Sequence, residues 1–211
     1  MPVFIHKLCC LWVLLWGLSF AQAAERAAEG IELVFVGDVM LADTPGRLIR
    51  AGQDPFRYFA HELRRADLTI GNLECVISVK GRPIDKPYTF RAPKRALPLL
   101  KKYFSAVSVA NNHTGDFGKA AFTDMLSSLS KHEIPYVGGG HHLREAHQPF
   151  IRDIRGQRIG VLAYNGFFPR SFEALEGSPG SAWLDDDFVM HDIRHAKQQL
   201  GVDFLIVYPH W

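Results

Sequence analysis

The sequence has few cysteines and little net charge, and it contains no internal repeat or low-complexity segment. Only three of its 211 residues are cysteine, and its formal net charge is +2. A nucleic-acid-binding surface requires a clear basic excess, so the balanced charge argues against a nucleic-acid partner. Cys9 and Cys10 lie in the first 23 residues, and removal of that segment would leave Cys75 without a partner for a disulfide. We therefore expect a core that is stabilised by packing alone.

The N-terminal segment, residues 1–23, has the features of an export signal. A weakly basic start (His6 and Lys7) precedes an almost unbroken apolar run over 8–20, and Ala-Gln-Ala at 21–23 matches a cleavage site. The run is too short for an ordinary membrane-spanning helix. We predict a cleaved signal peptide and an exported protein, periplasmic or in the cell envelope; an uncleaved N-terminal anchor is the alternative. Cleavage would leave 188 residues, enough for one domain.

From residue 31 onward, short apolar runs alternate with amphipathic stretches, which predicts an α/β fold with a largely parallel sheet. The expected strands cover 31–36, 67–70, 105–109, 135–137 and 203–207, with a hairpin at 150–154 and 158–163. The expected helices cover 56–63, 93–103, 119–129 and a stretch that follows 185–187. Two segments rich in proline or glycine, 80–93 and 165–183, are expected as loops, and the second is long enough to form a functional lid.

Polar side chains follow four of the predicted strands, at the point where each strand ends. They are Asp38, Glu74, the pair Asn112 and His113, and His210. The carboxyl ends of parallel strands share one edge of a sheet, so we expect these groups to meet. Two carboxylates, a carboxamide and imidazole suit Mn²⁺, Zn²⁺ or Fe²⁺. Each residue alone also has an ordinary structural interpretation as a turn residue or a core histidine. Their joint placement is what favours a shared site.

Several motifs in order give a family resemblance. Segments 37–41, 71–74 and 110–118 and the terminal His210-Trp211 resemble the motifs of bacterial capsule synthesis proteins of the CapA and PgsA type. Those proteins are associated with poly-γ-glutamate capsule production and are related to calcineurin-like metallophosphoesterases. The resemblance implies a metallophosphoesterase-like fold, a layered α-β-β-α sandwich, over 31–211. The family's pattern continues past His-Trp, so the resemblance also implies a domain truncated at its C-terminus.

The same resemblance assigns roles to residues. It implies two divalent metal ions, with ligands at Asp38, Glu74, Asn112 and His210. His113 would protonate the leaving group, a task that suits an imidazole because it titrates near neutral pH. Asp116 would orient His113 or the turn. A capping role for Asp116, at the helix that begins near Gly118, is the alternative.

Other basic residues are assigned by position. Lys86 and Arg91, in the proline-rich loop, are predicted to bind a phosphoester or an anionic polymer, with a solvated loop as the alternative. His142 stands where the family usually has asparagine, and we expect it to cap a helix, with an added metal ligand as the alternative. The histidines away from the strand ends are expected on the surface; they are His132, His141, His147, His191 and His195.

Two functions stay open on these grounds. The first is an exported metal-dependent hydrolase that acts on a phosphoester or a capsule-type polymer, with His113 as the acid. The second is a non-catalytic accessory protein for assembly or transport of an anionic polymer, with membrane capsule-synthesis machinery as a partner. The paired carboxylates, the Asn-His pair and the terminal histidine favour the first.

Overall fold

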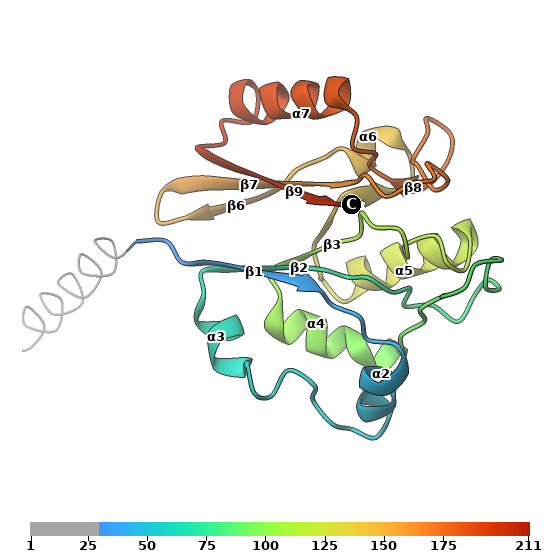
Figure 1. The fold of residues 1–211 in the computed structure, drawn as a ribbon. Coiled ribbons are helices and arrows are strands. Elements are labelled where there is room, and N and C mark those ends of the chain that lie inside the picture. Colours follow the sequence, from blue (N-terminus) through green and yellow to red (C-terminus); the bar gives the residue numbers. More distant parts are fainter. Residues whose placement is uncertain (1–29) are drawn as a thin grey trace, which may run out of the picture. The chain divides into compact units, whose positions relative to one another are not determined.

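Two β-sheets lie between layers of helices in the computed structural model, which describes residues 30–211 (Figure 1). Residues 33–211 cluster as a single unit. The expected signal peptide at 1–23 lies outside the described residues, so export stays a prediction. In the described part of the chain, no helix has the length and apolar character needed to cross a membrane.

The first sheet contains four parallel strands in the order β1-β2-β3-β4. These strands are β1 (Leu33–Asp38), β2 (Leu68–Asn72), β3 (Ala106–Ser108) and β4 (Tyr136–Val137). All four were predicted, with slightly different ends. Strands β2 and β3 are buried along their whole length, which is why both appear in the sequence as continuous apolar runs. Strand β1 forms an edge and is only partly buried.

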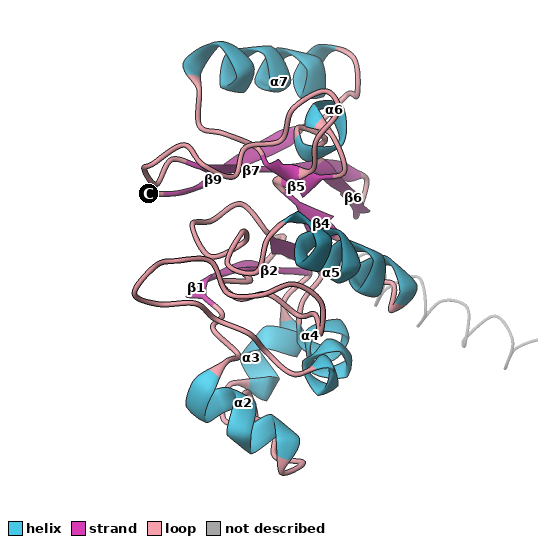
Figure 2. Cartoon of the chain, turned by 90° about the vertical axis from the view of Figure 1, so that its right-hand side faces the viewer, coloured by secondary structure: helices cyan, strands magenta, loops and turns pink. Residues whose placement is uncertain are grey.

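Helices cover the outer face of this sheet (Figure 2). They are α2 (Asp43–Arg50), α3 (Ala60–Arg65) and α4 (Leu97–Tyr103), the last preceded by a 3₁₀ turn, η1 (Lys94–Ala96), while α5 (Lys119–Lys131) lies beside the sheet. Helix α5 buries Phe122, Met125, Leu126 and Leu129, the apolar face that the sequence predicted. Helix α2 was not predicted because it contains Pro45 and Gly46. The proline is tolerated because it lies in the first turn.

The second sheet has the order β6-β7-β9. Its strands are β6 (Phe150–Ile154), β7 (Gln157–Asn165) and β9 (Phe204–His210), and a small antiparallel pair is formed by β5 (Gly139–Gly140) and β8 (Gly180–Ser181). The predicted hairpin is β6 and β7, and β9 runs parallel to β7. Helices α6 (Leu143–Ala146) and α7 (Asp186–Gln198) lie on the outer face (Figures 1 and 2). The order of layers is α-β-β-α, as the family resemblance implied. Strand β9, which ends at His210, lies in the second sheet, so the expectation that all the site strands share one sheet was wrong.

His147 was predicted on the surface, and this prediction was wrong. Its side chain is buried, its Nδ1 atom lies 2.6 Å from Oδ2 of Asp192, and its ring packs against Phe188. The hydroxyl of Tyr164 donates to the same carboxylate oxygen at 2.9 Å. We call His147, Asp192 and Tyr164 the buried network; it ties α7 to β7 and to the end of α6. The prediction that His142 caps a helix is confirmed. Its side chain caps α6 by accepting a hydrogen bond from the backbone N–H of Glu145.

Candidate functional site

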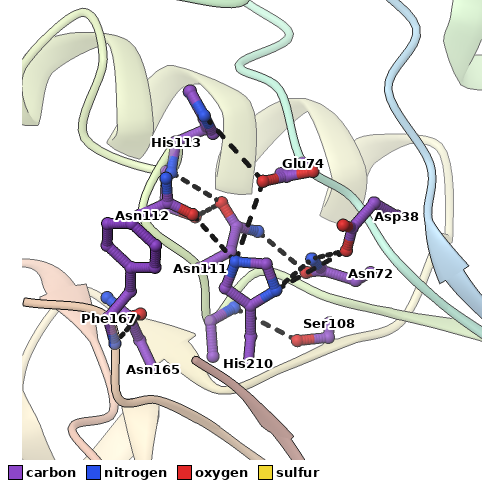
Figure 3. A network of polar contacts seen from close by, with 12 residues as sticks. Asp38, Asn72, Glu74, Ser108, Asn111, Asn112, His113, Asn165, Phe167 and His210 are labelled. Atoms are coloured by element: carbon purple, nitrogen blue, oxygen red, sulfur yellow. Dashed lines mark hydrogen bonds and ion pairs between the residues drawn. The ribbon is translucent and has the colours of Figure 1, made fainter. Parts of the chain in front are cut away.

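The ends of three strands bring Asp38, Asn72 and His210 together (Figure 3). Asp38 and Asn72 end the neighbouring strands β1 and β2 and are paired in register. His210 ends β9 in the other sheet. The side chains at the carboxyl ends of both sheets therefore meet at one point, although the sheets themselves are separate.

Asp38, Glu74 and His210 form a cluster of potential metal ligands. Each offers one ligand atom, and these atoms all lie within 4.8 Å of one another. Oδ1 of Asp38 lies 3.5 Å from Nδ1 of His210, and Oε1 of Glu74 lies 3.7 Å from Nε2 of the same ring. The structure thus brings together three of the four residues predicted as ligands within reach of a single cation.

Asn112, the fourth predicted ligand, lies beside this cluster. Its Oδ1 atom is 2.8 Å from Nε2 of His210 (Figure 3). A carboxamide oxygen only accepts hydrogen bonds, so Nε2 carries the proton and Nδ1 keeps its lone pair. Burial lowers the pKa of His210, although Asp38 opposes this effect. A neutral imidazole is the form that binds metal.

Two further asparagines hold the cluster in place. Asn72 donates from Nδ2 to Oδ1 of Asp38 at 2.8 Å, and the same nitrogen lies 3.1 Å from Nδ1 of His210. Asn111 is fully buried; it donates to Oδ1 of Asn72 at 2.9 Å and accepts from the backbone N–H of His113 at 3.0 Å. Sequence reasoning gave neither asparagine a role. The available signal was their position in the same short motifs as Glu74 and Asn112.

The electrostatics of Glu74 fit a cation site. Burial, together with the neighbouring Asp38, raises the pKa of this carboxyl to about 7, while His113 opposes the shift. The ionised form therefore lacks sufficient compensation from the protein itself. A divalent ion between the carboxylates and His210 would supply that compensation, and the mixed oxygen and nitrogen donors suit Mn²⁺, Zn²⁺ or Fe²⁺.

His113 faces the cluster from the turn after β3. Its Nε2 atom lies 3.8 Å from Oε1 of Glu74, and its Nδ1 atom lies 2.8 Å from Oδ2 of Asp116. Asp116 is fully buried and pairs with Nζ of Lys86 at 2.5 Å. The alternative that Asp116 caps the next helix was wrong, because Gly118 is the N-cap of α5 and no side chain caps that helix. Asp116 instead orients the imidazole of His113.

The two cations predicted to bind substrate make contacts within the protein. Besides its ion pair, Lys86 donates to the backbone oxygen of Asn112 at 2.9 Å. Arg91 donates to the backbone oxygens of Lys80 and Gly81 at 2.7 and 3.1 Å, and its guanidinium lies 3.8 Å from the ring centre of Phe117. Arg91 therefore stabilises its loop and lies outside the cluster. Its role in substrate binding stays a prediction.

Comparison with known proteins gives this site a family context. The model of the family described as "Bacterial capsule synthesis protein PGA_cap" matches residues 32–211. The chain belongs to this family. A capsule biosynthesis protein CapA of Bacillus anthracis is 24% identical over 202 residues, which cover 92% of this chain and 49% of the relative. The PGA biosynthesis protein CapA of Bacillus subtilis is 25% identical over 213 residues, which cover 95% of this chain and 56% of the relative.

A third relative has a different description. A Mycobacterium tuberculosis protein named "Probable polyglutamine synthesis accessory protein" is 32% identical over 157 residues, 69% of this chain and 41% of its own length. The chain thus spans about half the length of the curated relatives that it matches.

A solved structure supports the fold class of this family member. A Staphylococcus aureus protein provisionally named a 5'-nucleotidase matches with a TM-score of 0.50 at 16% identity, over 84% of this chain and 36% of that one. The likeness confirms the predicted metallophosphoesterase-like α/β fold. At this identity it shows the fold alone.

Proposed function

We propose that this family member is a metal-dependent phosphoesterase-like hydrolase that acts in the biosynthesis of a capsule polymer of the poly-γ-glutamate type. The observation that carries the proposal is the convergence of Asp38, Glu74 and His210 within 4.8 Å, with the imidazole of His113 beside them. Asp38, Glu74 and His210 would hold the ion, and Asn112 would complete or orient the set. The bound ion would supply Lewis acidity and charge neutralisation for attack by water.

The protein's own acid in this reaction is His113. Nδ1–H donates to the carboxylate of Asp116, and a second proton placed on Nε2 would point toward the cluster. As water bonds to phosphorus and the bond from phosphorus to the alcohol oxygen breaks, Nε2 gives its proton to that oxygen. The proton lost by the attacking water passes to solvent. Lys86 and Asp116 keep the ring in place during this transfer.

Replacing His113 with glutamine should test this role. We expect kcat for hydrolysis of an alkyl phosphate to fall by about 100-fold, because a poor leaving group requires protonation. Hydrolysis of 4-nitrophenyl phosphate should fall much less, because its leaving group departs as the anion. Mn²⁺ binding, measured by calorimetry, should persist, because His113 is not one of the three clustered donors. Equal losses on both substrates would contradict an acid role.

The accessory function is the second candidate, and the name of the Mycobacterium tuberculosis relative favours it. A non-catalytic binding protein would support polymer production equally well with glutamine at position 113. Complementation of a strain that lacks the gene, with protein levels matched, separates the candidates: lost polymer supports hydrolysis, and normal polymer supports the accessory role.

We also propose that the protein is exported, because residues 1–23 carry the pattern of a signal peptide. Cell fractionation should then place the chain in the periplasm or envelope, and mass spectrometry should find a mature N-terminus at Ala24. Recovery of the chain in the cytosol with Met1 intact would contradict export, whereas envelope-bound protein with an intact N-terminus would indicate an anchor.

A further inference from the structure

A cavity of about 620 Å³ opens directly beside His113. Its walls come from two loops, residues 84–88 and 165–172, and from the turn that carries Asn112 and His113. The volume suits a small molecule or one terminal group of a larger one. These loops are parts of the two irregular segments of the sequence, and apart from Lys86 the proposed hydrolysis gives their residues no role so far.

The first wall is attached to the two residues that flank and orient the acid, Asn112 and Asp116. The backbone N–H of Ile84 donates to the backbone oxygen of Asp116 at 2.9 Å. The side chain of Lys86 reaches Asp116 and the backbone oxygen of Asn112. Loop 84–88 is therefore positioned by the residue that orients His113. Its Tyr88 side chain, which lines the cavity, is 71% exposed.

The second wall is attached to the end of β9. The backbone N–H of Gly166 donates to the backbone oxygen of His210 at 2.7 Å, and the ring of Phe167 lies 6.5 Å from the imidazole of that histidine (Figure 3). Phe167 and Phe168 both line the cavity and are 46% and 75% exposed. Aromatic side chains thus stand on both walls, next to the acid and the candidate metal ligands.

The charges of the cavity exclude a simple polyanion groove. Lys86 is neutralised by Asp116. The other charged lining residues, Asp85 and Lys119, carry opposite charges, and the ammonium of Lys119 donates to the hydroxyl of Ser178. Without a positive excess, ionic attraction gives a polyanion little advantage here. The lining rings of Tyr88 and Phe168 are largely exposed, so they can bind a ligand through apolar burial and stacking.

We infer that this cavity receives the leaving group of the substrate, and that this group presents an aromatic or other planar, apolar face. The inference rests on the proposed function, because His113 must protonate the oxygen of whatever departs. It adds a substrate class: a phosphoester whose alcohol carries a planar apolar group beside the scissile bond. Tyr88 and Phe168, one on each wall, determine the specificity.

Two phosphonates that differ only by a ring test the inference. The full chain is titrated with phenylphosphonate and with methylphosphonate, with and without Mn²⁺, by calorimetry. We expect phenylphosphonate to bind about tenfold more tightly, because only its ring reaches the aromatic walls. Tyr88→Ala and Phe168→Ala should each remove most of that difference while leaving Mn²⁺ and methylphosphonate binding unchanged. Tyr58→Ala is the matched control, since Tyr58 is 77% exposed and does not line the cavity.

The outcomes separate the inference from the proposed function. Equal binding of the two phosphonates in the presence of Mn²⁺ overturns the inference and leaves the metal site standing. Absence of Mn²⁺ binding overturns the proposed function, and a ring preference that Tyr88→Ala abolishes would still support the cavity. Failure of phenylphosphonate to bind under both conditions overturns the inference, as does a ring preference that both cavity variants keep.

Discussion

Replacing Glu74 with glutamine should weaken Mn²⁺ binding by roughly 1,000-fold, or about 4 kcal/mol. Glu74 contributes one of only two carboxylates in the three-donor cluster, and hard divalent ions depend on anionic oxygen ligands. Glutamine keeps the shape and one oxygen but loses the charge. Calorimetric titration with Mn²⁺ measures the change. Glu62→Gln is the matched control, because Glu62 is an exposed carboxylate on α3 that pairs only with His61 among the ion pairs of the described residues.

The same substitution should stabilise the metal-free protein at alkaline pH. Burial and Asp38 raise the folded-state pKa of Glu74 from 4.5 to about 7. A carboxyl with a raised pKa stabilises the fold below its unfolded value, and this contribution is lost as pH rises through the folded value. The wild type with chelator should therefore lose stability between about pH 5 and pH 8 relative to the glutamine variant.

The Glu74 variant is thus expected to bind Mn²⁺ more weakly and yet to be more stable without metal at pH 8. Melting temperatures at pH 5 and pH 8, with chelator present, check the second expectation. A cation site should show weaker Mn²⁺ binding and a higher relative melting temperature at pH 8 in the Glu74 variant. A purely structural carboxylate would give unchanged Mn²⁺ binding and a lower melting temperature at both pH values. That second result would remove the physical basis for the proposed centre.

The strands were predictable because their burial leaves a simple pattern. Strands β2 and β3 are covered on both faces, so their sequences are continuously apolar. The division into two sheets was not visible in the residue pattern, since β9 pairs in parallel with β7 and a parallel strand in either sheet gives the same apolar signal. Only the family resemblance implied the sandwich. Helix α2 was not predicted because Pro45 and Gly46, two residues unfavourable in helices, lie close to its start.

The candidate metal ligands could be predicted from the sequence, whereas the asparagines that hold them in place could not. Asp38, Glu74 and His210 follow apolar runs, and this position at strand ends points to a shared edge. Asn72 and Asn111 act through hydrogen bonds to side chains 34 and 39 positions away, which no local pattern reveals. The contacts of the basic loop were hidden for a related reason. Charge alone cannot show that Arg91 is held by backbone oxygens of its own loop.

The buried network of His147, Asp192 and Tyr164 leads to the second large effect, which concerns stability. Asp192→Ala should destabilise the protein by about 3 kcal/mol or more, because it leaves a buried imidazole N–H and a buried hydroxyl without an acceptor. For a domain of this size the melting temperature should fall by roughly 10 °C. Asp153→Ala, which removes an exposed carboxylate paired with Arg158, should cost at most about 1 kcal/mol.

Asp192→Asn tests which part of the effect depends on charge. Burial alone would raise the pKa of Asp192, but hydrogen bonds from His147, His191 and Tyr164 outweigh it and hold the pKa below its usual value. A depressed carboxyl stabilises the fold above its unfolded pKa and loses that contribution as pH falls through the folded value. The stability gap between wild type and Asp192→Asn should therefore be present at pH 6 and shrink below about pH 4.

Urea titrations at pH 6 and pH 3 measure this gap in the free energy of unfolding. Mn²⁺ binding by the folded variants should stay normal, since no member of the network belongs to the clustered donors. A gap that is the same at pH 6 and pH 3 would show that the charge of Asp192 contributes nothing. Unchanged stability of Asp192→Ala would show that the network does not hold α7 against the second sheet. Lost Mn²⁺ binding in a folded variant would instead connect the outer helices to the ends of the strands.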